Sequence, residues 1–167
     1  MFLIFFLTLF LTNCKDKKIE LQKESINLEK VQIDTSKIAV LKYDSRFFVS
    51  NNQSKPTNLA ADDFIKVEKM LHNFISDYNA EQNSNSSESK RITEDLLINL
   101  NRYKRQYFAL LNAKGEKEIW INCFCKDNNP NWKTEKVIVK DGGNCYFNLK
   151  VNLTTEEYYE VYINGNA

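Results

Sequence analysis

The hydrophobic and polar positions divide the chain into three stretches. Residues 2–11 are apolar apart from Thr8, and residues 15–34 carry closely mixed positive and negative charge. From Ile38 onward, apolar side chains recur at the spacings of helices and strands. This pattern predicts an apolar leader over residues 1–13, a charged tether over residues 14–36 and a single folded domain over residues 37–167.

One long helix is predicted after the polar loop at residues 50–56. Apolar residues recur there at three- and four-residue steps and form one stripe, made of Phe64, Val67, Leu71, Phe74 and Tyr78. Thr57 or Asn58 can cap the first turn, and Asp62 and Asp63 favour the positive end of the helix. We expect the stripe to pack against a sheet.

The segments on either side of this helix give weaker signals. Residues 38–41 and 47–49 are β-rich and predict strands at the start of the domain. Residues 80–89 are small and polar without periodicity, which predicts a surface loop. Residues 92–100 fit either a short helix or an extended strand.

Alternation from Tyr103 onward predicts antiparallel strands. A turn at residues 114–115 would place four apolar residues on one face, in the pairs Leu110–Ile119 and Phe108–Ile121. The other face would carry the pairs Ala109–Trp120 and Tyr107–Asn122.

A second hairpin is predicted around a turn at residues 154–156. It would form the pairs Val151–Tyr159, Leu149–Val161 and Phe147–Ile163. This register sets Lys150 opposite Glu160, and opposite charges across a strand pair favour it. Residues 137–139 predict a further strand between the two hairpins, joined to the next one by a turn with two glycines.

Together these elements predict an α+β fold, with an antiparallel β-sheet of four to six strands and one main α-helix packed on a face. A helix followed by a long antiparallel meander is the element order of cystatin-like folds. We therefore expect a cystatin-like arrangement, by analogy.

Composition narrows the class of protein. The 167 residues include 11 Phe, 8 Tyr and 2 Trp, enough for one aromatic-rich core. The formal net charge of +1 provides no bulk attraction for polyanions, so no nucleic-acid partner is expected.

The leader ends in Leu11-Thr12-Asn13-Cys14, which resembles the signal peptide and lipobox of a bacterial lipoprotein. The resemblance implies cleavage before Cys14, acylation of Cys14 with chains such as palmitate, and anchoring in the cell envelope, at the outer membrane. Residues 2–11 are shorter than the ~20 residues that span a bilayer. An unlipidated secreted protein and an uncleaved anchor are the alternatives.

Three motifs in the C-terminal two thirds of the chain carry a second resemblance. They are YKRQY at residues 103–107, GEKEIWINCFC at residues 115–125 and DGGNCYFN at residues 141–148. They resemble a group of small bacterial lipoproteins to which no activity is attached. The resemblance implies a shared domain and adds no mechanism.

With Cys14 assigned to lipid, three cysteines remain, which permit one disulfide and leave one thiol. An oxidising envelope favours a bond from Cys145 to Cys123 or Cys125. A strand at residues 137–139 would place Cys125 and Cys145 roughly 20 Å apart, too far for a bond. A disulfide would therefore exclude a plain meander, and without one the thiols would be small buried hydrophobes.

No catalytic or metal-binding constellation stands out, and no cofactor is expected. Cys-x-Cys lacks the Cys-x-x-Cys spacing of structural zinc sites, and the only histidine, His72, has no nucleophile motif near it. Three adjacent carboxylate pairs fit helix starts and turns: Asp62/Asp63, Glu94/Asp95 and Glu156/Glu157. Three cationic residues are interpreted as solvated strand-face charges: Arg102, Lys104 and Arg105.

The less apolar sheet face is the candidate binding surface. Aromatic and amide side chains are expected there, namely Trp120, Asn122, Phe124, Tyr146, Asn148, Tyr158 and Tyr162. Such a mixture accepts a glycan, a peptide or a partner protein. Trp132 is either an exposed contact or folds back onto the sheet. Alternatively, a tether, a second helix or a dimer partner covers this face.

The sequence thus predicts a protein that is lipid-anchored in the envelope and binds a partner without catalysis. The alternatives are an envelope hydrolase with two carboxylates across a cleft and a dimeric structural lipoprotein. The ligand, the side of the membrane and the oligomeric state stay open.

Overall fold

The computed structural model describes residues 33–44, 54–85, 96–126 and 129–165. The predicted leader, Cys14 and most of the predicted tether lie outside these residues.

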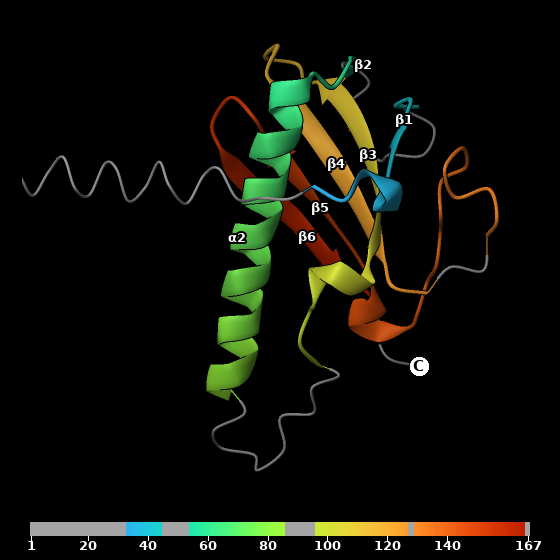
Figure 1. Cartoon of the computed structure of the whole chain (residues 1–167). Coiled ribbons are helices and arrows are strands. Elements are labelled where there is room, and N and C mark those ends of the chain that lie inside the picture. Colours follow the sequence, from blue (N-terminus) through green and yellow to red (C-terminus); the bar gives the residue numbers. More distant parts are fainter. Residues whose placement is uncertain (1–32, 45–53, 86–95, 127–128, 166–167) are drawn as a thin grey trace, which may run out of the picture. The chain divides into compact units, whose positions relative to one another are not determined.

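One helix, α2 (Ala61–Asn85), lies across one face of a six-stranded sheet (Figure 1). The strands are β1 (Ile38–Leu41), β2 (Lys55–Pro56), β3 (Lys104–Leu111), β4 (Lys117–Phe124), β5 (Tyr146–Asn152) and β6 (Glu157–Ile163). Short 3-10 turns are η1 (Thr35–Lys37), η4 (Leu100–Arg102) and η5 (Gly143–Cys145).

The sheet has the order β1-β3-β4-β5-β6, with β2 also paired to β3. Strands β3 to β6 form a plain antiparallel meander, whereas β1 runs parallel to β3. The α+β fold is therefore confirmed, with a mostly antiparallel sheet and one main helix. The finer expectation of a cystatin-like arrangement stays a prediction.

The apolar stripe of α2 faces the sheet as predicted. Val67, Leu71 and Phe74 are buried, and Phe64 and Tyr78 are partly buried against the same core. On the sheet side this core is built from alternate strand residues: Tyr107, Ala109, Ile119, Ile121, Cys123, Phe147, Leu149 and Val151. The stripe thus determines which face of the sheet the helix covers.

The start of α2 differs from the prediction. The helix begins at Ala61, so neither Thr57 nor Asn58 caps it. Instead the Asp63 carboxylate accepts a hydrogen bond from the Ala60 amide at 2.8 Å and pairs with Lys117 at 2.8 Å. Burial opposes ionisation of this carboxyl, but its hydrogen bonds and the charge of Lys117 prevail and lower the pKa of Asp63.

The end of α2 also differs from the prediction. The helix continues to Asn85, so the first part of the predicted loop over residues 80–89 is helical, and the rest lies outside the described residues. Asn79 fixes the returning chain, because its side-chain amide bonds both the N–H and the carbonyl of Ile98, at 2.8 and 2.9 Å. Tertiary contacts of this kind stabilise a helix end whose sequence alone indicates a loop.

The β3–β4 hairpin has a register one residue away from the predicted one. Tyr107 lies opposite Ile121 and Phe108 opposite Trp120, so Tyr107 faces the helix and Phe108 faces away from it. The loop is longer than predicted: Asn112 accepts from the Gly115 amide and donates its own amide to Glu116. Gly115 has a φ of 81°, which glycine adopts without strain.

The β5–β6 hairpin keeps the predicted pair Phe147–Ile163 and then shifts by one residue. A bulge at Glu160, which has a φ of 47°, brings Tyr159 opposite Lys150 and Tyr158 opposite Val151. The predicted pairs Val151–Tyr159 and Leu149–Val161 are therefore wrong. Lys150 still reaches Glu160, with Nζ 2.7 Å from a carboxylate oxygen.

A charged group is buried between α2 and the sheet. The Glu68 carboxylate lies 3.3 Å from Arg105 Nε and accepts a hydrogen bond from the Tyr107 hydroxyl. Arg105 was expected to be solvated, but it is 4 % exposed and Glu68 is 2 % exposed. Burial and the charge of Glu68 raise the pKa of Tyr107, which keeps its hydroxyl as a donor.

Replacing Glu68 with alanine should destabilise the domain by about 3–5 kcal/mol, because Arg105 would remain buried without its counter-ion. Chemical denaturation of wild type and Glu68→Ala measures this loss. The matched control is Glu81→Ala, an exposed position on the same helix, which should change the free energy of unfolding by less than about 1 kcal/mol. Equal effects of the two substitutions would contradict a buried ion pair.

Candidate functional site

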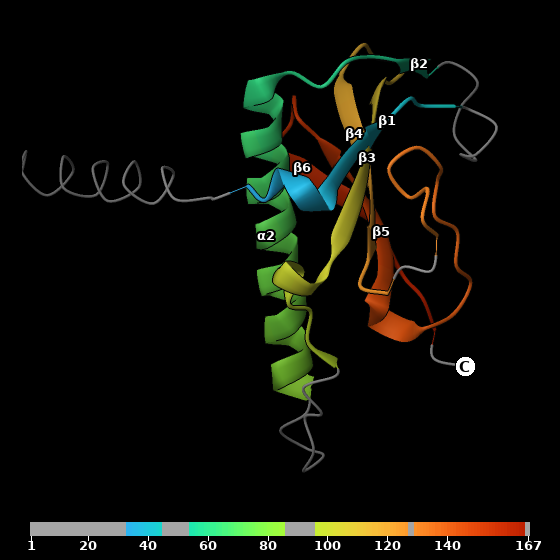
Figure 2. The same cartoon turned by 45° about the vertical axis from the view of Figure 1, so that its right-hand side comes forward.

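The sheet face opposite α2 is covered by residues 129–142, which we call the strap (Figure 2). The predicted strand at residues 137–139 is absent, and the strap instead contains turns and irregular chain. Trp132 packs edge-on against Phe124 with ring centroids 5.8 Å apart and is 6 % exposed. Trp132 therefore folds back onto the sheet, as one of the two predicted alternatives has it, and is not an exposed contact.

Two amide side chains on neighbouring strands hold the main chain of the strap. Gln106 donates to the carbonyls of Trp132 and Glu135, at 2.5 and 2.6 Å, and accepts from the Val137 amide at 2.9 Å. Asn122 donates to Gln106 at 3.1 Å and to the Val137 carbonyl at 2.8 Å. We call Gln106 and Asn122 the amide clamp.

Two further contacts hold the later part of the strap and the ends of the loop that contains it. Asn164 donates to the carbonyls of Val139 and Asp141 at 2.9 and 2.8 Å. A disulfide joins Cys125, which follows β4, to Cys145, which precedes β5. Closing a loop of this size stabilises a fold by about 3 kcal/mol.

The disulfide corrects the reasoning about strand order. Phe124 lies opposite Tyr146, so the next pair in the same register is Cys125 and Cys145, with Cα atoms 5.0 Å apart. Strands β3 to β6 are still a plain meander, because β4 and β5 are neighbours in the sheet and no described strand lies between them. Cys123 is the remaining thiol among the described residues, and burial raises its pKa, so it behaves as a small core hydrophobe.

Most residues of the predicted binding face share the side of the sheet that the strap covers. Trp120, Asn122, Phe124, Tyr146 and Asn148 lie on β4 and β5 on this side, and Tyr162 lies beside Asn148. Asn122 and Phe124 are buried there. A cavity of about 240 Å³ remains under the strap, and its lining includes Trp120, Asn122, Tyr146 and Asn148 together with strap residues 136–139.

Tyr158 is the exception, and its predicted place on this face is wrong. The bulge at Glu160 turns it toward α2, where its ring lies 5.6 Å from that of Phe74. Its hydroxyl donates to Asp77 at 2.7 Å.

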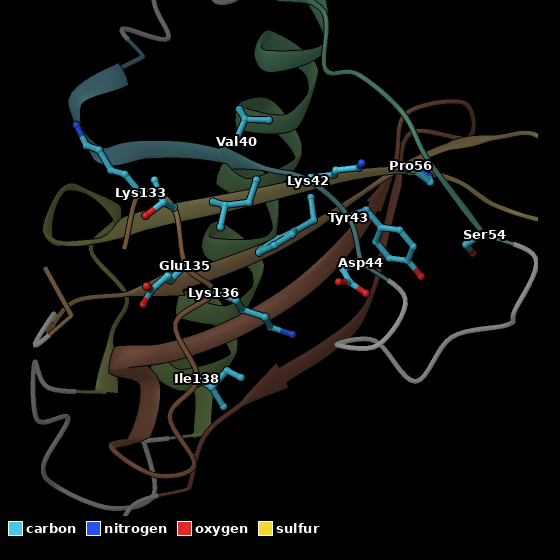
Figure 3. A pocket seen from close by; sticks show the side chains of 13 residues that line it. Val40, Lys42, Tyr43, Asp44, Ser54, Pro56, Lys133, Glu135, Lys136 and Ile138 are labelled. Carbon is cyan, nitrogen blue, oxygen red and sulfur yellow. The ribbon is translucent and has the colours of Figure 1, made fainter. Parts of the chain in front are cut away.

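Beside the strap lies a larger open groove of about 950 Å³ (Figure 3). Residues 40–44, in and after β1, form one wall, and strap residues 133–136 and 138 form the other. Ser54 and Pro56 also line the groove, as does the buried ring of Phe108. Lys136 and Ile138 line both this groove and the smaller cavity.

The groove combines apolar side chains with charges of both signs. Ile138 of the strap wall is 66 % exposed, and Leu41 and Phe108 add apolar lining from the sheet side. Val40 points away from the groove, on the same sheet face as Tyr107. Its cationic residues are Lys42, Lys133 and Lys136, and its acidic residues are Asp44 and Glu135. The Lys136 ammonium lies 4.4 Å from the centre of the Trp120 ring, and partial burial lowers its pKa.

The candidate catalytic and metal-binding groups do not come together. Within the described ranges, no group of three or more His, Cys, Asp or Glu residues could hold a metal ion. His72 is exposed on α2 and Cys123 is buried in the core. Asp63 is paired with Lys117, Glu156 lies 3.8 Å from Lys66, and Glu94/Asp95 lies outside the described residues.

Sequence analysis missed the groove. Its two walls are about ninety residues apart in the chain, and no local pattern links them. One signal was present: Ile138 stands in the apolar run at residues 137–139, which predicts a further strand of the sheet rather than the wall of a groove.

Among the described helices, none combines the length and the apolar character needed to cross a bilayer. Comparisons with protein-family models, with curated proteins and with solved structures gave no match.

Proposed function

We propose that this protein is a lipid-anchored, non-enzymatic binding protein of a bacterial envelope, and that its ligand lies in the groove beside the strap. The observation that carries the proposal is the groove itself. Its volume of about 950 Å³ is at the upper end for ligand sites, and Leu41, Phe108 and the exposed Ile138 give it an apolar lining. Apolar side chains held open to solvent in a concave site favour a binding role.

The two halves of the proposal have separate support. Anchoring rests on the lipobox-like residues before Cys14, and the charged residues that follow would separate the domain from the membrane. Binding rests on the groove. The sheet face that sequence analysis singled out supports it less well, because the strap already occupies that face.

An envelope hydrolase is the second candidate, favoured by one observation. Asp44 and Glu135 line opposite walls of the same groove. However, the Glu135 oxygens lie 3.4 and 3.3 Å from the side-chain amides of Asn129 and Asn131, within the strap. The carboxylate of Glu135 is therefore held by its own loop, and a binding role fits the groove better than two facing catalytic carboxyls.

Lipidation at Cys14 is tested by labelling cells with a fatty-acid analogue while they express the full chain. The wild-type protein should carry the label and Cys14→Ala should not, because the thiol is the attachment point. Cys123→Ser, which removes a buried thiol of the domain, should keep the label. A wild-type protein without label, or a labelled Cys14→Ala, would contradict the anchor.

Binding in the groove is tested by placing a photo-crosslinking phenylalanine derivative at position 138 of the full chain in intact cells. Irradiation should join an envelope component to position 138, because this side chain lies in the groove wall. The same residue at position 65, an exposed isoleucine on α2 that is 46 % exposed, should give no such adduct. No adduct at position 138, or equal adducts at both positions, would reject the groove as the binding site.

A further inference from the structure

We propose that the outer edge of β6 binds an extended segment of a partner protein, in which cationic and apolar residues alternate, and that this segment adds to the sheet as a further strand. The surface is separate from the groove, so the inference goes beyond the proposed function and does not rest on it.

β6 is the last strand of the sheet, and its outer edge is unpaired among the described strands. It pairs with β5 alone (Figure 1). The Asn164 amide, directly after β6, donates to the Tyr146 carbonyl of β5. Since successive residues of an antiparallel strand turn their main-chain groups to opposite edges, the N–H and carbonyl of Ile163 point outward. An unpaired edge of this kind is a template for an incoming strand.

On the α2 face, this edge offers apolar surface and space. Tyr158 and Ile163 pack against the core on this face, and alternation from Ile163 places Val161 there, where it is 40 % exposed. A hollow of about 430 Å³ lies between α2 and the start of β6. Of the described residues that line it, none belongs to β5, so the hollow lies at the margin of the sheet. The helix therefore leaves room for the side chains of a strand beside β6.

On the opposite face, the edge carries a carboxylate and an exposed aromatic ring. Glu157 alternates with Tyr158, and Tyr162 alternates with Ile163, so the side chains of Glu157 and Tyr162 face away from α2. Tyr162 is 60 % exposed. Carboxylates attract the charged groups of lysine and arginine, and a tyrosine ring accepts these groups over its face. We therefore expect the added strand to present cationic side chains on this face.

The charge of β6 favours a cationic partner over a second copy of this chain. Residues 156–163 contain three glutamates and no lysine or arginine. Glu156 lies 3.8 Å from Lys66. Glu160 lies 2.7 Å from Lys150, whereas Glu157 has no cationic partner among the described residues. In a pair of β6 strands from two copies, these carboxylates would meet, and like charges across a strand pair are destabilising.

The probe is an array of octapeptides in which lysine or arginine alternates with apolar residues. The seven residues of β6 at about 3.3 Å each give an edge of ~23 Å, which an octapeptide spans. Each peptide is printed with a counterpart in which glutamate replaces the cationic residues. It is also printed with two N-methylated twins, one methylated at odd positions and one at even positions. The purified full chain should bind a subset of the cationic peptides and none of their glutamate counterparts.

The twins report strand addition. Only every second N–H of an added strand faces β6. One twin of each bound peptide should therefore bind at least about tenfold more weakly than its parent, while the other twin should bind within about threefold of it. Purely electrostatic adsorption would not distinguish the two twins.

Charge variants locate the binding. Glu157→Lys should weaken binding of the selected peptides at least about tenfold, because it sets like charges against each other, and Glu157→Gln should weaken it by a smaller factor. Glu135→Lys, which makes the same change of net charge on the strap, should bind these peptides as wild type does. Circular dichroism of all variants establishes that they are folded.

The outcomes separate this inference from the proposed function. No bound peptide, glutamate counterparts that bind as well, two twins of equal affinity, or binding insensitive to Glu157→Lys would overturn the inference. Binding lost in Glu135→Lys but kept in Glu157→Lys would place the peptide in the groove and would overturn it too. The proposed function is tested separately by the crosslink at position 138, so either proposal can fail while the other stands.

Discussion

The arrangement of this domain depends on the hydrogen bonds between the amide clamp and the strap. Gln106 and Asn122 lie opposite each other on β3 and β4 and satisfy four main-chain groups of the strap. Buried main-chain groups must find partners, and a sheet face supplies them only where it carries side chains such as these. The clamp therefore allows a segment without regular structure to cover the centre of the sheet.

The consequence is a sheet that is buried on both faces at its centre. Every residue of β3 except the first and last is buried, because α2 covers one side and the strap the other. Each side contains polar groups that are paired within the fold. Glu68 and Arg105 form an ion pair under the helix, and the amide clamp forms hydrogen bonds under the strap. The open surface then lies at the margin of the strap, where the groove is found.

Helix periodicity and strand alternation in the sequence were sufficient to predict the main helix and the two hairpins, but not the registers of the hairpins. The stripe from Phe64 to Tyr78 and the two hairpins are present, because burial imposes periods of 3.6 and 2 on the chain. The registers of both hairpins depend on loop length and on a bulge at Glu160, and sequence alternation does not reveal either. The cap at Asp63 and the burial of Arg105 depend on distant partners, Lys117 and Glu68.

In the candidate site, too, sequence alternation predicted which residues share a face but not what packs against them. Trp120, Asn122, Phe124, Tyr146 and Asn148 do share one face, since they alternate on adjacent strands. Sequence alternation could not reveal that this chain itself, through Trp132 and Val137, packs against the face. Likewise, Glu68 occurs four residues after Phe64 on the helix stripe, a position from which burial could have been inferred, but its partner could not.

Amide hydrogen exchange measured by NMR at Val137 and Ile138 tests the central claim most directly. The clamp accepts the Val137 N–H, whereas no described residue accepts a hydrogen bond from the Ile138 N–H, so Val137 should exchange far more slowly than its neighbour. The difference should disappear in Gln106→Leu, which removes the acceptor. Equal, fast exchange at both residues in the wild type would mean that the strap is not held by the amide clamp, and the account would be wrong.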